Sequence, residues 1–244
     1  MEKWQERRFF TIWEYLSYKI TMTYGVSELQ EVGRDEFRQR CLEKIPSWYK
    51  PLFHLLVPSL FGSLVIFGSS FLIKDLKMVE LITVPLTYFI SNLLEWLAHK
   101  NLLHKRSSLA PVLYEQHTPI HHRIYVTEDM SIHSSKEFRL VLIPAYGIML
   151  IFLINLPLTT ILYFLLGPNV AALFVMTSMA YVVGYEWLHL SYHLPKDHFI
   201  TRLGIVRQLS HHHAIHHDPK LMQRWNMNVT VPIWDFILRT TYRS

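Results

Sequence analysis

The sequence of 244 residues contains a single cysteine, Cys41. One cysteine excludes an internal disulfide framework and a zinc module built on cysteine ligands. The first ten residues, MEKWQERRFF, are charged and lack a short apolar core followed by small residues, so we expect no cleavable signal peptide. Low-complexity segments and a repeat period of the kind found in solenoids are also missing, which excludes solenoid architectures. The length suits one domain, or one domain with an N-terminal extension.

Hydrophobic residues, in contrast, make up 50% of the chain, beside a formal charge of +5. This combination indicates a membrane protein. Four stretches approach or exceed the roughly 20 apolar residues that a helix needs to cross a bilayer. They are residues 52–73, 78–98, 140–166 and 170–188. The third stretch is too long to stand upright, so we expect it to tilt or to kink, most simply at Pro157.

The short connections predict two helical hairpins, because KDLK and GPN leave no room for a domain between the paired spans. Residues 1–51, 99–139 and 189–244 then lie on one side of the membrane. These three segments hold 22 of the 24 lysines and arginines. The excess of positive charge places both termini and the long loops in the cytoplasm, in a bacterial inner membrane or the endoplasmic reticulum. A soluble protein with four buried helices is the disfavoured alternative.

The chain divides into two parts at residue 52, where the first predicted span begins. Residues 52–244 form the membrane-embedded domain. Residues 1–51 form a helical cytoplasmic or interfacial segment, in which aromatic and apolar side chains recur at helical spacing: Trp4, Phe9, Phe10, Trp13 and Leu16. This pattern predicts an amphipathic helix on the membrane surface or on the cytoplasmic domain. A packing helix without membrane contact is an equal alternative.

Histidine is the most informative residue type, because fifteen are present and ten fall into four groups. The groups are His99 with His104 (H-x4-H), His117 with His121 and His122 (H-x3-H-H), His189 with His193 (H-x3-H), and His213 with His216 and His217 (H-x2-H-H). His212 is an alternative to His213. Each group lies at the end of a predicted span or in a segment on the same side of the membrane.

The spacing has a physical reason. Residues three or four apart share one face of a helix, so a pair at i and i+4 can hold one metal ion. Ten imidazoles exceed the coordination of one ion but suit two ions with about five ligands each. Neutral imidazole binds iron, zinc, copper and nickel, so the pattern predicts a nitrogen-rich dinuclear site. The remaining histidines fit no group and are expected to be ordinary surface or core residues: His54, His133, His198 and His211.

Two acids lie inside predicted spans, where a charged side chain is expensive and usually marks function or a buried partner. Glu95 and Glu186 precede His99 and His189 by four and three residues. Metal-bound histidines often donate their second N–H to a carboxylate, so we expect these two acids to orient the ligands. Asp218 and Asp235 are further candidates, although an acid in a loop is usually solvated.

The four histidine groups, in this order around two hairpins, resemble the fatty acid hydroxylase and sterol desaturase superfamily. The run HAIHHDPKLMQRWNMNVTVPIWDFILRT resembles the ending of that family, in which the last histidine group leads to an asparagine and then to a Pro–aromatic–Asp motif, here Pro232 to Asp235. The resemblance covers roughly residues 50–242. The second group departs from it, because many members have two intervening residues where this chain has three. This leaves open which of His117 and its neighbours would reach which metal.

The resemblance implies an all-α protein with four transmembrane helices in two hairpins and a cytoplasmic helical cap that holds two metal ions. The ions are usually iron, with zinc as a substitute in purified material. The ten grouped histidines would be their ligands. The implied activity is O₂-dependent oxidation of a C–H bond in a fatty acyl or sterol-like membrane lipid. Electrons would come from NAD(P)H through a separate donor protein, since the chain shows no fused haem domain. No nucleic-acid partner is expected.

Other functions remain as alternatives at this point. A lipid desaturase would use the same scaffold, and H-x3-H in the third group favours a hydroxylase. A membrane metal transporter would place its ionisable ligands near the midplane of the bilayer, whereas these histidines lie at one edge. A structural zinc protein needs four ligands rather than ten.

Overall fold

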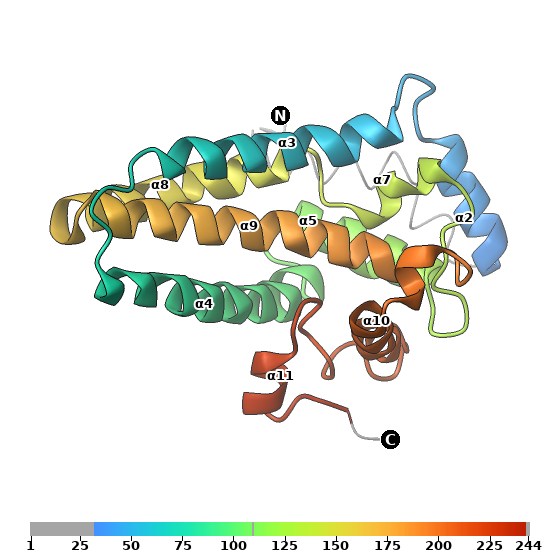
Figure 1. Ribbon diagram of the computed structural model, residues 1–244. Coiled ribbons are helices and arrows are strands. Elements are labelled where there is room, and N and C mark those ends of the chain that lie inside the picture. Colours follow the sequence, from blue (N-terminus) through green and yellow to red (C-terminus); the bar gives the residue numbers. More distant parts are fainter. Residues whose placement is uncertain (1–31, 109, 243–244) are drawn as a thin grey trace, which may run out of the picture.

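The computed structural model describes residues 32–108 and 110–242, and within these ranges it is helical without any strand (Figure 1). Four helices are long and apolar enough to cross a membrane when the turns that extend α4 are counted with it. They are α3 (Pro51–Ser70), α4 (Thr83–Ala98), α8 (Gly147–Leu166) and α9 (Pro168–Tyr192). A 3-10 turn, η1 (Met78–Ile82), precedes α4, and a π-helical turn, η2 (His99–Leu103), follows it. The expected helical class and the four candidate spans are confirmed.

Helix α9 is the centre of the bundle and packs against α3, α8 and α4 (Figure 1). Within the most apolar 18-residue stretch of α9, 44% is buried, whereas only 6% of the corresponding stretch of α8 is buried. The other three helices direct large apolar side chains outward, as Phe67 and Phe164 do. Such a surface is costly in water but suits the hydrocarbon of a bilayer.

The third candidate span is shorter than the predicted residues 140–166, because these residues do not form one continuous helix that tilts or kinks. A short helix, α7 (Phe138–Val141), ends before an extended residue, Leu142, and α8 begins only at Gly147. Pro144 explains the interruption, because proline lacks an N–H and restricts the residue before it to extended conformations. Pro157 lies inside α8 without ending it. The interruption leaves backbone groups of residues 140–143 free to contact side chains near the histidines.

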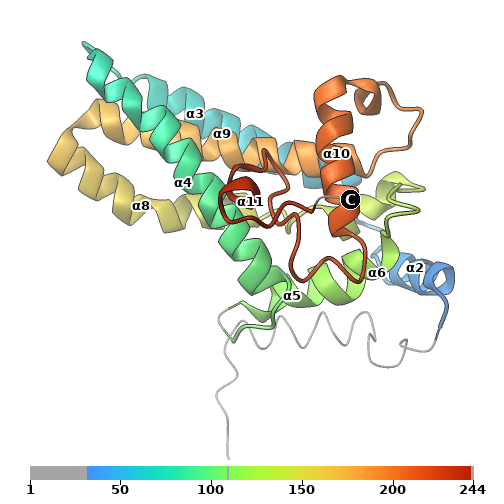
Figure 2. The ribbon, with the colours of Figure 1, turned by 90° about the horizontal axis from the view of Figure 1, so that it is seen from below.

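The shorter helices gather around the ends of α4 and α9 (Figure 2). They are α2 (Arg34–Glu43), α5 (Pro111–Gln116), the π-helical turn η3 (His117–His121), α6 (His122–Ile124), the 3-10 turns η4 (Ser135–Glu137) and η5 (Phe199–Arg202), α10 (Gly204–His216) and α11 (Ile233–Ile237). The side chains of the predicted N-terminal amphipathic helix, Trp4 to Leu16, lie outside the described residues. Helix α2, in the same segment, buries Phe37 and Cys41 in a core shared with Ile120 and Tyr125.

The close contact of α3 with α9 depends on Gly62. A Cβ atom built there would lie 2.5 Å from Cγ2 of Val183, a side chain that is stiff on a helix. We expect Gly62→Ala to destabilise the protein by about 1–3 kcal/mol, measured by unfolding in detergent. Gly68→Ala on the same helix is the control, because a Cβ at Gly68 meets no atom within 4 Å. Equal stability of the two variants would show that α3 and α9 do not pack as described.

Candidate metal centre

All ten grouped histidines come together at one end of the bundle, and each is at most 7% exposed. Nine of them form two sets in which the candidate ligand atoms, one ring nitrogen from each residue, lie within 4.8 Å of one another. The first histidine group is His99, His104, His117, His122 and His216. The second histidine group is His121, His189, His193 and His213, to which we add His217, whose Nε2 lies 3.0 Å from Nε2 of His213. Segments of all four sequence patterns contribute to the cluster.

Backbone carbonyls set the tautomer of half of these rings. A carbonyl oxygen can only accept a hydrogen bond, so each Nδ1 that faces one carries the proton and leaves Nε2 bare. The pairs are His99 with Met227 (2.5 Å), His216 with Trp225 (2.9 Å), His121 with Leu140 (3.0 Å), His193 with Met130 (2.8 Å) and His217 with Tyr125 (2.6 Å). The bare Nε2 atoms are available as metal ligands.

The bare nitrogens of the first group face one another at short range. Nε2 of His104 lies 2.9 Å from Nε2 of His216 and 3.2 Å from Nε2 of His99. His104 donates its Nδ1 proton to Thr118, whose hydroxyl is committed to the Leu103 carbonyl, so none of these Nε2 atoms carries a proton. Two ligands at right angles around a metal, each about 2.1 Å away, would be roughly 3.0 Å apart. A cation would therefore fit and would relieve the repulsion.

The second group contains buried nitrogens without any hydrogen-bond partner among the described residues. They are Nε2 of His121, Nε2 of His193, both ring nitrogens of His189 and Nδ1 of His213. A buried polar atom without a partner costs free energy and calls for an explanation such as an ion. This orphaned set of nitrogen donors fits a metal ion that binds imidazole.

Burial also keeps the rings in the form that binds metal. Removal from water lowers the pKa of His121 to about 4, and the same effect, reinforced by neighbouring His99, lowers the pKa of His104 to about 2. The pKa of His213 lies well below its ordinary value for the same reason. The imidazoles are thus neutral near pH 7, as ligation requires.

Two π-helical turns explain how residues five apart share one group. His99 begins η2 and His104 directly follows it, just as His117 begins η3 and His122 follows that turn. The His104 N–H donates to the His99 carbonyl at 3.1 Å. In an α-helix, five residues would rotate the second side chain to roughly 140° from the first. The wider π turn brings both onto one face, and such turns often occur at functional sites. The α-helical spacing rule therefore fails for His117 and His121, which enter different groups.

Both three-histidine patterns divide in the same way. The outer pair, His117 with His122 or His213 with His217, stays in one group, and the middle residue crosses to the other. Thus His121 joins the second group and His216 joins the first. The extra residue in H-x3-H-H is absorbed by η3, which keeps the outer pair together. This crossing ties the two groups into one cluster.

The acids predicted to orient histidines do something else. The Glu186 carboxylate accepts from the backbone N–H of Ile143 at 3.4 Å. Glu95 accepts from Tyr181, from the hydroxyl of Thr230 (2.5 Å) and from the backbone N–H groups of Val229 and Thr230. Within the described chain, neither carboxylate has a hydrogen bond to a histidine, so the prediction is corrected. Backbone carbonyls orient five of the histidines instead. Glu95, on α4, binds the C-terminal stretch at Val229 and Thr230.

His212 is corrected as an alternative ligand, because its Nε2 bonds the Asp235 carboxylate at 3.0 Å outside both groups. Asp235 itself is fully buried rather than solvated. Burial alone would raise the pKa of Asp235, but hydrogen bonds from His212, Thr240, Asn228 and Met227 outweigh it and leave the pKa below its ordinary value. The sequence contained a signal that Asp235 is a buried hydrogen-bond acceptor, because Asp235 is the last residue of the Pro–aromatic–Asp motif.

The four ungrouped histidines lie outside both metal-ligand sets found in the described part of the chain. His54 bonds the Tyr49 hydroxyl at 2.7 Å and the Ile143 carbonyl at 2.8 Å. His198 accepts from the N–H of Ile200 at the start of η5. His133 lies beside the ion pairs of Arg38. His211 lines a cavity beside α10.

The fold and the site together define a protein with four span-capable helices and buried histidine clusters that can hold metal ions. The model of the fatty acid hydroxylase family matches residues 84–240, which include all ten grouped histidines. Because the match covers more than half of the chain, the protein belongs to the fatty acid hydroxylase family, within the fatty acid hydroxylase and sterol desaturase superfamily. No curated protein and no solved structure matches the chain. The family implies a metal-dependent oxidoreductase that acts on membrane lipid.

Proposed function

We propose that this protein is a di-metal lipid hydroxylase that uses O₂ to oxidise a C–H bond of a fatty acyl or sterol-like membrane lipid. The observation that carries the proposal is the pair of buried histidine groups at one end of a span-capable bundle, in which the unprotonated Nε2 atoms of His104 and His216 lie 2.9 Å apart. The first histidine group would hold one ion and the second histidine group the other. Iron is the proposed metal, and zinc is expected to replace it in some preparations.

Bound iron would supply the redox chemistry that activates O₂, with electrons from NAD(P)H delivered by a separate donor protein. The chain contributes the arrangement of the ligands. Backbone carbonyls hold five rings in the tautomer that leaves Nε2 free, and burial excludes water from the ten imidazoles. A site closed to water protects a strongly oxidising centre from side reactions.

The proposed topology has α3 with α4 and α8 with α9 crossing the bilayer as two antiparallel pairs, with the helical cap and both termini in the cytoplasm. The distribution of lysine and arginine supports this orientation. The exposed apolar side chains of α3 and α8 would face lipid. A lipid tail could then reach the histidines from the membrane while its polar head stays at the surface.

Hydroxylation and desaturation differ in the fate of the substrate radical, and the H-x3-H spacing of His189 and His193 favours hydroxylation. Desaturation on the same scaffold is the alternative. The position of the histidine groups argues against a transporter, since they lie where α4 and α9 end rather than midway along them.

The test has two measurements on the full chain. Metal analysis of purified protein is expected to give two ions per chain, with iron predominant when iron is supplied. Mass spectrometry of lipids from cells with and without the gene is expected to show a product that has gained one oxygen atom, only when O₂ is present. A product that has lost two hydrogens would identify a desaturase instead. Metal-free protein and an unchanged lipid profile would contradict the proposal.

A further inference from the structure

The C-terminal loop carries two carbonyls into the first histidine group. Trp225 and Met227 accept from Nδ1 of His216 and of His99 at 2.9 and 2.5 Å. Asn226, between them, has a φ of 55° in the left-handed region, which asparagine tolerates better than most residues. Its backbone N–H donates to the Thr240 carbonyl at 2.8 Å. This local turn lets residues on both sides of Asn226 reach the same histidine group.

One carboxylate fixes this loop from behind. Asp235, fully buried, accepts from the N–H of Met227 at 2.9 Å and from the N–H of Asn228 at 2.8 Å. The Asn228 N–H and the Met227 carbonyl belong to one peptide group and point in opposite directions. The Asp235 carboxylate therefore binds one side of the peptide whose other side binds His99. A charged acceptor on the N–H polarises that peptide and strengthens its carbonyl as an acceptor.

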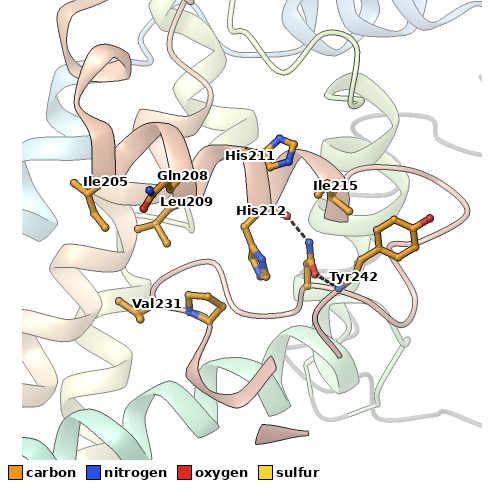
Figure 3. Close-up of a pocket in the computed structure, with 10 residues that line it drawn as sticks. Ile205, Gln208, Leu209, His211, His212, Ile215, Val231 and Tyr242 are labelled. Carbon is orange, nitrogen blue, oxygen red and sulfur yellow. Dashed lines mark hydrogen bonds between the residues drawn. The ribbon is translucent and has the colours of Figure 1, made fainter. Parts of the chain in front are cut away.

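The other partners of the carboxylate hold it in place. The indole N–H of Trp96 donates at 3.1 Å and the Thr240 hydroxyl at 2.6 Å. His212 completes the set with its Nε2 at 3.0 Å. In Figure 3 the His212 ring points from α10 toward the stretch that carries Val231, into a cavity of about 530 Å³. The His212 side chain is 12% exposed, so this cavity gives access to the network from outside.

The second histidine group has a separate support. The carbonyls that orient His121, His193 and His217 belong to residues 125–140, far in sequence from the loop of Met227. That segment is held by the buried ion pair of Arg38 and Glu137, whose closest atoms are 2.8 Å apart. Loss of the Asp235 carboxylate therefore weakens the orientation of the first group and leaves that of the second.

We propose that Asp235, held by His212, is the positioning residue of one metal ion only, the ion of the first histidine group. It acts through the peptide of Met227 on His99, as a carboxylate–peptide–imidazole relay in which a peptide group stands between the acid and the ligand. The inference rests on the proposed function, because it needs the two-ion centre. The inference goes beyond the proposed function because it states that binding of one ion depends on the Asp235 side chain and binding of the other does not.

The experiment compares metal binding in full-length wild type and Asp235→Asn. The amide replaces one accepting oxygen with a donor, so it cannot receive both backbone N–H groups. We expect the affinity for one of the two ions to fall by roughly 10–100-fold, while the other ion stays bound as in wild type. In protein loaded with isotopically enriched iron, Mössbauer spectra are expected to show one of the two iron signals lost or shifted. Asp218→Asn, the same change beside His217, is the control and should retain both ions.

A second variant, at His212, tests the same relay by making use of the cavity that this side chain lines. His212→Ala is expected to weaken the same ion, and free imidazole is expected to restore its iron signal, because the cavity leads to the vacated position. If Asp235→Asn does not fold, this measurement still tests whether only one of the two ions depends on the Asp235 network. Equal loss of both ions, or retention of both with unchanged spectra, would overturn the inference. Wild-type protein without two ions would instead overturn the proposed function.

Discussion

Replacing His193 by alanine is expected to abolish lipid oxidation while the protein still inserts into the membrane. His193 is fully buried directly after α9, with its Nδ1 bonded to the Met130 carbonyl and its Nε2 facing the second histidine group without a partner. Its ring centroid lies 4.8 Å from that of His121. Alanine removes one nitrogen donor from this group and opens a gap beside it. His217→Ala is expected to have the same effect, since Nε2 of His217 lies 3.0 Å from that of His213.

Insertion should survive both changes, because it depends on the apolar spans and neither histidine belongs to one. Membrane fractionation measures insertion, and lipid mass spectrometry measures the product. His198→Ala is the matched control, since it removes an imidazole five residues from His193 but outside both groups. Full lipid oxidation by the His193→Ala, His217→Ala double variant would refute the site.

Replacing Arg38 by alanine is expected to lower the free energy of unfolding by about 3–5 kcal/mol, the range found when a buried ion pair loses one partner. The Arg38 guanidinium is buried and binds Glu137 (3.0 Å from Nε), Asp129 (3.3 Å) and the Ser131 carbonyl. Glu137 is itself fully buried, so the substitution would leave a carboxylate without its cation. Unfolding in detergent, followed by circular dichroism, measures the loss.

The same variant should also lose activity, because Glu137 accepts from the Tyr125 hydroxyl at 2.9 Å and the Tyr125 carbonyl orients His217. Arg40→Ala is the control on the same helix, where an exposed pair with Glu36 is expected to contribute less than about 1 kcal/mol. If Arg38→Ala proves as stable and as active as Arg40→Ala, the ion pair has no role in holding the second group.

Several features could be predicted from sequence because they depend on local composition. The apolar stretches predicted the four span-capable helices, with ends that shift by a few residues, since hydropathy is a property of neighbouring residues. The third stretch was the exception, because Pro144 mattered more than the unbroken run of apolar residues around it. The repeated close spacing of histidines singled out the ten that the structure brings together. The order of these groups also sufficed to indicate the family that the family model confirms.

The sequence alone thus determined the helical class, the apolar spans and the set of histidines. The tertiary structure decided how the histidines divide, because η2 and η3 change the helical period locally and this change is invisible in spacing. It also decided what orients them. Trp96 meets Asp235 across 139 residues of chain and Arg38 meets Glu137 across 99. Hydrogen bonds between such distant residues depend on the packing of whole segments, which no local pattern encodes.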